Sequence, residues 1–159
     1  MIQFIRNIIN GRLFGHPVHM MLVHFPSALF PFSAVLALLT YIQRDNELAL
    51  FNFYVICAAV VTGWTTMIFG IIDLMKLQEN KPAFTTGLIH GSLNTLWLSV
   101  FTVIGGVQVK YYPNIPVPSL AVVIIELVVF LSMLYSNHLG GRLVLKFGSG
   151  TKEEDRSYH

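Results

Sequence analysis

The stretch VPSLAVVIIELVVFLSMLYSN, residues 117–137, decides the fold because its only charged side chain is Glu126. An apolar run of this length is long enough to cross the ~30 Å hydrocarbon core of a bilayer as a helix. Three more apolar stretches of comparable length precede it, at about residues 17–42, 48–77 and 85–109. The sequence therefore predicts four transmembrane helices.

The composition excludes a soluble protein. Only 11% of the 159 residues are charged and 54% are hydrophobic, whereas soluble domains carry about 25% charged residues. Four spans leave no room for a separate soluble domain. Cys57 is the only cysteine, which excludes an internal disulfide and a cysteine metal cluster. The predicted fold class is an all-α integral membrane four-helix bundle.

The ends of the chain differ from the apolar middle. The segment MIQFIRNIINGRLFG, residues 1–15, has no apolar core long enough for a cleavable signal peptide. Its apolar residues recur at helical spacing with Arg6 and Arg12 between them, so we expect a short amphipathic helix lying at the membrane interface. Residues 16–148 form the predicted membrane domain, and residues 149–159 form a polar tail.

The basic residues predict the orientation. Of the ten lysines and arginines, only Arg44 and Lys110 fall on the side of the membrane that carries the first and third connections between helices. The other eight fall on the side that carries both termini. Cytoplasmic loops carry the excess of basic residues in membrane proteins. We therefore expect both termini in the cytoplasm, which agrees with an even number of spans.

Most of the histidines fall toward one half of the predicted bundle. Successive helices alternate in direction, so the start of the first and third helices meets the end of the second and fourth. The ionisable residues near these positions are His16, His19, His24, Asp73, His90 and His138. Ionisable side chains within membrane spans are costly and mark functional sites.

Depth within the helices selects one pair. His24 lies seven residues beyond Pro17 and His90 five residues beyond Thr85, which places them ~10 Å and ~8 Å into their helices at 1.5 Å per residue. Two histidines at matched depth on parallel helices can face each other across the bundle. His19 is expected to lie shallower, near the headgroups.

The surroundings of His90 fit a cofactor. Asn94 and Trp97 follow it at i+4 and i+7, on the same helical face. A stripe of small residues in the second helix allows either close helix packing or a flat slot for a ring. That stripe consists of Ala59, Gly63, Thr66 and Gly70.

Glu126 stands apart from the histidines, nine residues into the fourth stretch. A charged side chain in the middle of a bilayer costs about 3 kcal/mol, so we expect this carboxyl group to be protonated. It could relay protons, bind a quinone, or form a hydrogen bond to a neighbouring helix or subunit.

The opening GHPVHMMLVHFPSALF, residues 15–30, resembles the bacterial membrane-protein family known as domain of unknown function 2231. Family members read approximately G-H-P-x-H-P-x-L-V-x-F-P, and Met20 here replaces the second proline of many members. Shorter resemblances occur at GIIDL (70–74), HGSLN (90–94) and GGRLVLKFGSG (140–150). The resemblance implies a four-helix fold in the bacterial inner membrane. Some relatives are joined to cytochrome c-like domains, which implies redox work.

The leading hypothesis is a b-type cytochrome subunit. Membrane four-helix bundles commonly hold haem iron by histidines from two helices. His24 and His90 would be the axial ligands, Asn94 and Trp97 would support them, and Arg142 would pair with a haem propionate. The protein would pass electrons between the quinone pool and a partner protein, as part of a complex or a homo-oligomer. Nothing in the sequence indicates nucleic-acid binding.

Two alternatives remain open from the sequence. Imidazole also ligates zinc, iron and copper, so a metal site without porphyrin is the second hypothesis. Its candidate ligands are His16, His19, His24, Asp73, His90 and His138. The third hypothesis is a structural subunit of a membrane complex, in which the histidines only cap helix ends or contact lipid headgroups.

Overall fold

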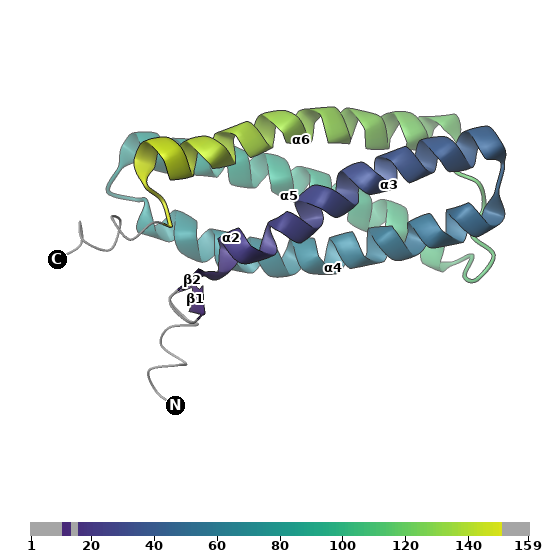
Figure 1. Cartoon of the computed structure of the whole chain (residues 1–159), viewed down its shortest axis with the longest axis horizontal. Helices are drawn as coiled ribbons and strands as arrows, with labels where there is room; N and C mark the ends of the chain where they lie inside the picture. The colour runs from purple at the N-terminus through teal and green to yellow at the C-terminus, as the bar shows by residue number, and fades with distance from the viewer. Residues whose placement is uncertain (1–10, 14–15, 151–159) are drawn as a thin grey trace.

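Four long helices lie side by side in a computed structural model that describes residues 11–13 and 16–150 (Figure 1). A two-stranded hairpin and one short helix precede them. In chain order the elements are β1 (Arg12–Leu13), β2 (His16–Pro17), α2 (Val18–Leu22), α3 (His24–Gln43), α4 (Asn46–Lys76), α5 (Lys81–Val109) and α6 (Leu120–Phe147).

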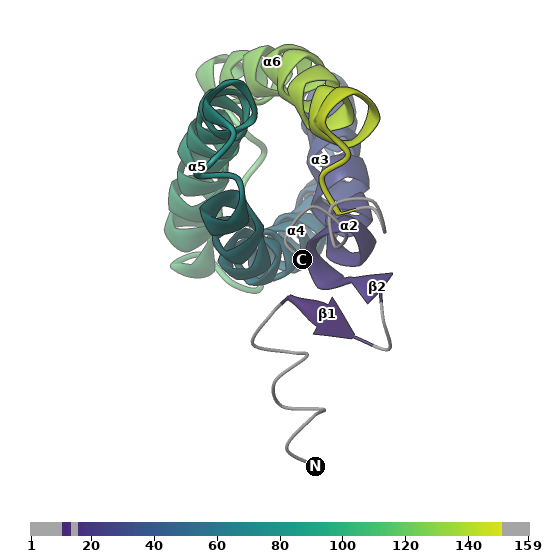
Figure 2. The same ribbon diagram turned by 90° about the vertical axis from the view of Figure 1, so that its left-hand side faces the viewer.

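The long helices form a ring, seen along the bundle axis in Figure 2. Both α3 and α5 pack against α4 and α6, so α3 and α5 are diagonal partners. We call the end that carries the hairpin and residues 148–150 the terminal end (Figure 1). The opposite end, which carries the α3–α4 turn and the α5–α6 connection, is the loop end.

The outside of the bundle is as apolar as its inside. Among the described residues, Val61, Leu131 and Ile42 expose 63–66% of their surface. Apolar surface this extensive is typical of a protein that faces lipid. Four helical segments are long and apolar enough to cross a membrane. The predicted four-helix membrane bundle is thus confirmed.

Aromatic side chains fill the centre of the bundle. Phe30 on α3 and Phe101 on α5 meet across the diagonal, with ring centroids 4.4 Å apart. Both are buried and belong to one apolar cluster with Ile56, Val129 and Met133. This cluster separates the terminal half of the interior from the loop half.

Helix ends follow the expected capping chemistry. The carboxylate of Asp45 accepts from the backbone N–H groups of Glu47 and Leu48 at the start of α4, at 2.8 and 3.2 Å. The side chains of Asn80 and Ser119 cap α5 and α6 in the same way. Such caps satisfy N–H groups that have no partner within the helix.

The last helix is longer than the sequence predicts. We expected it to end near Asn137, but α6 continues to Phe147 and ends at Gly148, whose φ is +69°. The basic residues Arg142 and Lys146 lie within it. Long basic side chains extend toward the headgroups from a helix end, so their charge does not stop the helix.

The N-terminal segment also differs from expectation. An interfacial helix was predicted over residues 1–15, but Arg12–Leu13 pairs as a strand with His16–Pro17. Residues 1–10 and 14–15, which carry the rest of that prediction, lie outside the described residues. Most of the polar tail, residues 151–159, lies outside them too.

The first span is interrupted at Val23, between α2 and α3. Pro26 accounts for the break, since a proline has no N–H to donate and its ring clashes with the carbonyl four residues earlier. That carbonyl belongs to Leu22, the last residue of α2. The interruption lies one residue before His24.

Candidate functional site

His19 docks its imidazole ring on α4. Its Nδ1 lies 3.1 Å from the backbone carbonyl oxygen of Thr66. The ring covers Gly70, where a Cβ atom would lie 2.9 Å from the ring Cε1. A side chain larger than hydrogen at position 70 would therefore displace the ring.

His90 docks on α6 in the same manner. Its Nδ1 lies 2.8 Å from the carbonyl oxygen of Ser136 and 3.2 Å from the Ser136 hydroxyl. The ring covers Gly140, where a Cβ atom would lie 3.0 Å from Cε1. Each histidine thus forms a hydrogen bond to a backbone carbonyl that is followed, four residues later, by a glycine. Because glycine has no side chain, the imidazole ring can reach that carbonyl.

The hydrogen bonds determine the proton positions on both rings. A carbonyl oxygen can only accept, so Nδ1 carries the hydrogen in His19 and in His90. In a neutral imidazole the other nitrogen, Nε2, then holds the lone pair. Metal-ligating histidines typically donate their second ring N–H to a carbonyl or a carboxylate, which fixes ring orientation and tautomer.

The two histidines lie at the same depth. The Thr95 hydroxyl donates to Met67 Sδ at 3.3 Å, which sets the antiparallel register of α5 against α4. His90, five residues from Thr95 toward the terminal end, is therefore level with the turn that carries Gly70. Since the His19 ring covers Gly70, the two rings share a level.

Two further polar side chains accompany His90 on α5. The Asn94 amide nitrogen donates to the His90 carbonyl at 2.9 Å and lies 3.2 Å from His90 Nε2. An amide N–H near Nε2 is consistent with a lone pair on that nitrogen. The indole Nε1 of Trp97 is buried and has no hydrogen-bond partner among the described residues. Both residues were predicted to support His90; Asn94 contacts it, whereas Trp97, about two turns away, packs against the cluster around Phe30 and Phe101.

Other predicted site residues are not brought to this pair. The side chains of His16 and His24 are exposed, and no described contact joins His24 to His90. The carboxylate of Asp73 forms an ion pair with Lys76, with a distance of 2.7 Å from Oδ1 to Nζ.

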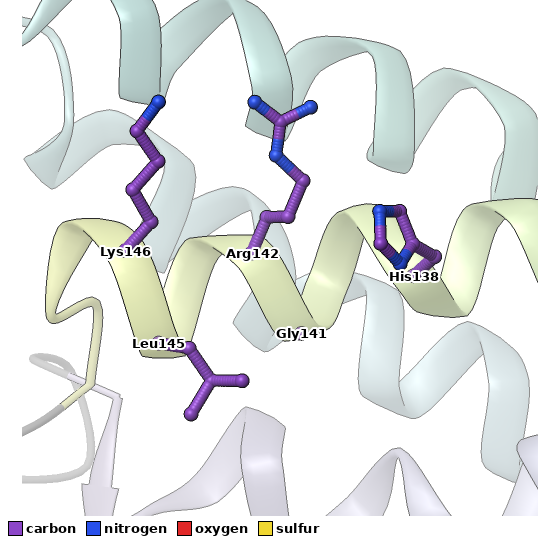
Figure 3. A pocket seen from close by; sticks show the side chains of 5 residues that line it. All are labelled: His138, Gly141, Arg142, Leu145 and Lys146. Atoms are coloured by element: carbon purple, nitrogen blue, oxygen red, sulfur yellow. The ribbon is translucent and has the colours of Figure 1, made fainter.

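His138 and Arg142 lie together on the surface of α6. With Lys146 they extend from one side of the helix, and Leu145 extends from the other (Figure 3). They line an open hollow of about 250 Å³ near the terminal end. Arg142 thus lies near the terminal end of α6.

The described residues offer two histidines at one level, one docked on α4 and one on α6, and no larger cluster. Within residues 11–13 and 16–150, no group of three or more His, Cys, Asp or Glu side chains could hold a metal ion. Two imidazoles from diagonal helices are the ligand set of a six-coordinate haem, in which the porphyrin supplies the other four nitrogens. Gly70 and Gly140 provide the close approach that each ring needs.

Sequence reasoning missed the role of His19, which it placed near the headgroups. The signal that could have found it is a hydroxyl residue followed by glycine at i+4, present in TMIFG (66–70) and in SNHLG (136–140). The small stripe of α4 was noted, and one of its two predicted uses, close helix packing, occurs; the slot for a cofactor ring stays a prediction. At Gly63 the Leu98 side chain occupies the space that a Cβ atom would need, so α4 and α5 pack closely there. At Gly70 the imidazole ring of His19 occupies the corresponding space.

Comparison with known proteins identifies the family of the chain but no individual related protein. No curated protein and no solved structure matches the chain significantly. The family model described as "Predicted membrane protein (DUF2231)" matches residues 15–153, which include every element from β2 to α6. The chain belongs to this family of predicted membrane proteins.

Proposed function

We propose that this protein is a b-type cytochrome in which His19 and His90 bind one haem between the helices. The observation that carries the proposal is the paired docking of the two rings, each with Nδ1 on a backbone carbonyl, so that Nε2 holds the lone pair. The Asn94 amide, 3.2 Å from His90 Nε2, would turn away from that nitrogen when it ligates. His19 replaces His24 in the pair expected from sequence, because the His24 side chain is exposed.

The surroundings support a flat apolar cofactor. Phe30 and Phe101 close the interior on the loop side of the histidines. Asn94 and Trp97 supply N–H donors beside His90, and the donor of Trp97 has no acceptor among the described residues. A buried donor without a partner is costly in a membrane, so an acceptor supplied by a bound group accounts for it.

A metal ion without porphyrin is the second candidate. Structural zinc sites use four protein ligands and catalytic ones three, whereas the described residues hold no group of three or more such ligands. A bare ion at His19 and His90 would need water or another subunit to complete its coordination. The donor set therefore favours haem.

The proposed role is electron transfer between the quinone pool and a partner protein in the bacterial inner membrane. The distribution of charge supports cytoplasmic termini. Of the described basic residues, only Arg44 and Lys110 lie at the loop end. The others, at the terminal end, are Arg12, Lys76, Lys81, Arg142 and Lys146. A haem at His19 and His90 would then lie in the cytoplasmic half of the membrane, and Arg142 is the nearest candidate for a propionate partner on α6.

The absorption spectrum of the purified protein tests the proposal. We expect Soret and alpha bands in the reduced-minus-oxidised difference spectrum, with one haem per chain after extraction. Protein without these bands but with stoichiometric zinc, iron or copper would support the metal site instead. Protein with neither haem nor metal would leave the structural-subunit hypothesis.

A further inference from the structure

The loop half of the bundle contains buried polar atoms that the histidine site does not use. Five buried side-chain nitrogen or oxygen atoms in the described part of the chain have no hydrogen-bond partner. One belongs to Trp97, beside His90. The other four come from four different helices: Thr40 Oγ1 on α3, Asn52 Oδ1 on α4, Gln108 Oε1 on α5 and Glu126 Oε1 on α6.

Helix positions place these four atoms toward the loop end. Thr40 is three residues before the end of α3, and Gln108 is one residue before the end of α5. Asn52 and Glu126 are each six residues beyond the start of their helices, which is ~9 Å at 1.5 Å per residue. The sequence placed Glu126 near the middle of the bilayer, and the later start of α6 brings it closer to the loop end.

Glu126 is enclosed on all sides. Its exposed fraction is 0%, and its Oε2 accepts a hydrogen bond from the Ser33 hydroxyl at 3.0 Å. Within residues 11–13 and 16–150 it forms no ion pair. An unpaired carboxylate in so dry a place is strongly disfavoured, so the group carries a proton.

Among the described residues, no other titratable side chain of α6 or of the helices packed on it, α3 and α5, lies at this level. On α4, across the bundle, Tyr54 is exposed and Cys57 is half-buried. On α3 the candidates are His24 and Tyr41, each more than two turns from Ser33. On α5 they are Lys81 and His90, which lie in the terminal half. On α6 itself the nearest is Tyr135, which is exposed. The proton on Glu126 is therefore controlled by its access to water.

We propose that Glu126 binds a proton reversibly and that water held by Asn52, Thr40 and Gln108 connects it to the loop end. Buried polar atoms without protein partners are the usual sites of internal water. In the exchange, a hydronium ion of this water chain gives its proton to Oε1, where an O–H bond forms and one water molecule remains. The cluster around Phe30 and Phe101 closes the opposite direction. A second apolar cluster of Ala49, Phe53 and Ile115 lies at the loop end, so the proposed water path runs beside it.

Infrared spectroscopy of the full-length protein in lipid nanodiscs tests this inference. We expect a carbonyl band of a protonated carboxyl group that is absent in Glu126→Gln and that shifts when the solvent is changed to D₂O. In wild-type protein labelled with ¹³C-glutamate the same band should move, which assigns it to a glutamate even if the variant folds poorly. This measurement does not depend on haem.

The proposed water path is tested by the rate of the D₂O shift. Thr40→Val and Asn52→Leu should slow the exchange about tenfold, since each removes one hydrogen-bonding group from the path. The matched controls Thr65→Val and Asn137→Leu, at exposed positions, should exchange at the wild-type rate. A missing glutamic-acid band, or equal rates in path variants and controls, would overturn the proposal.

Discussion

Purified His90→Ala protein is expected to carry no haem, and so is His19→Ala. Each substitution removes one of two axial nitrogens, and neither leaves a described histidine in a position to replace it. The measurement is the reduced-minus-oxidised absorption spectrum, normalised to protein and compared with wild type. Helix content by circular dichroism should be unchanged, because the His19 ring contributes one hydrogen bond to a neighbouring helix and the His90 ring at most two, both to Ser136. Such bonds contribute about 0.6 kcal/mol each in membranes.

His24→Ala is the matched control for both variants. It removes an imidazole from the same region of the first span, but one whose side chain is exposed. We expect it to retain full haem occupancy. Loss of haem in His24→Ala with retention in His19→Ala would refute the assignment of His19 and restore the pair expected from sequence.

The second large effect is expected at the two glycines beneath the rings. Gly140→Ala places a methyl group 3.0 Å from His90 Cε1, and Gly70→Ala places one 2.9 Å from His19 Cε1. Each ring must shift away from its carbonyl, so its Nε2 no longer has a fixed direction. Loss of such a supporting contact lowers metal affinity by about 10–100-fold, and haem retained after purification should fall accordingly.

Gly91→Ala is the control that distinguishes displacement of a histidine ring from any effect on haem content of replacing a helix glycine by alanine. Gly91 is adjacent to His90, yet a Cβ atom there would have no neighbour within 4 Å. Alanine is favoured over glycine in a helix by about 1 kcal/mol, so all three variants should keep their helices. Equal haem content in Gly140→Ala, Gly70→Ala and Gly91→Ala would show that the glycines do not support the site.

The spans were predictable because lipid leaves a strong compositional signal. Apolar runs of about twenty residues identified all four helices. Their ends were less predictable, as α6 shows, because Arg142 and Lys146 resemble a polar loop in sequence. The strand pairing of Arg12–Leu13 with His16–Pro17 was not predicted, since four residues give too short a pattern.

The candidate site was predictable in its depth and in one of its residues. His90 was identified, with Asn94 and Trp97 on its face, because residues at i+4 and i+7 share one side of a helix. His24 was chosen over His19 on depth alone. Depth ignores rotation about the helix axis. Two side chains five residues apart on an α-helix point in directions about 140° apart, so His19 and His24 cannot both face the interior. The interruption at Val23 adds a further change of direction.

The buried polar atoms of the loop half show a second limit of the sequence. Glu126 was conspicuous because it is charged, whereas Thr40 and Asn52 are common residues with no pattern of their own. Only the packing of four helices shows that their polar atoms are buried without partners among the described residues.

Electron paramagnetic resonance of the oxidised, purified protein tests the central claim most directly. Ligation of one haem by His19 and His90 predicts a low-spin ferric signal of the kind given by two axial imidazoles, integrating to one spin per chain. A high-spin ferric signal would mean that at least one of the two histidines does not bind iron, and the absence of any haem signal would contradict the account altogether.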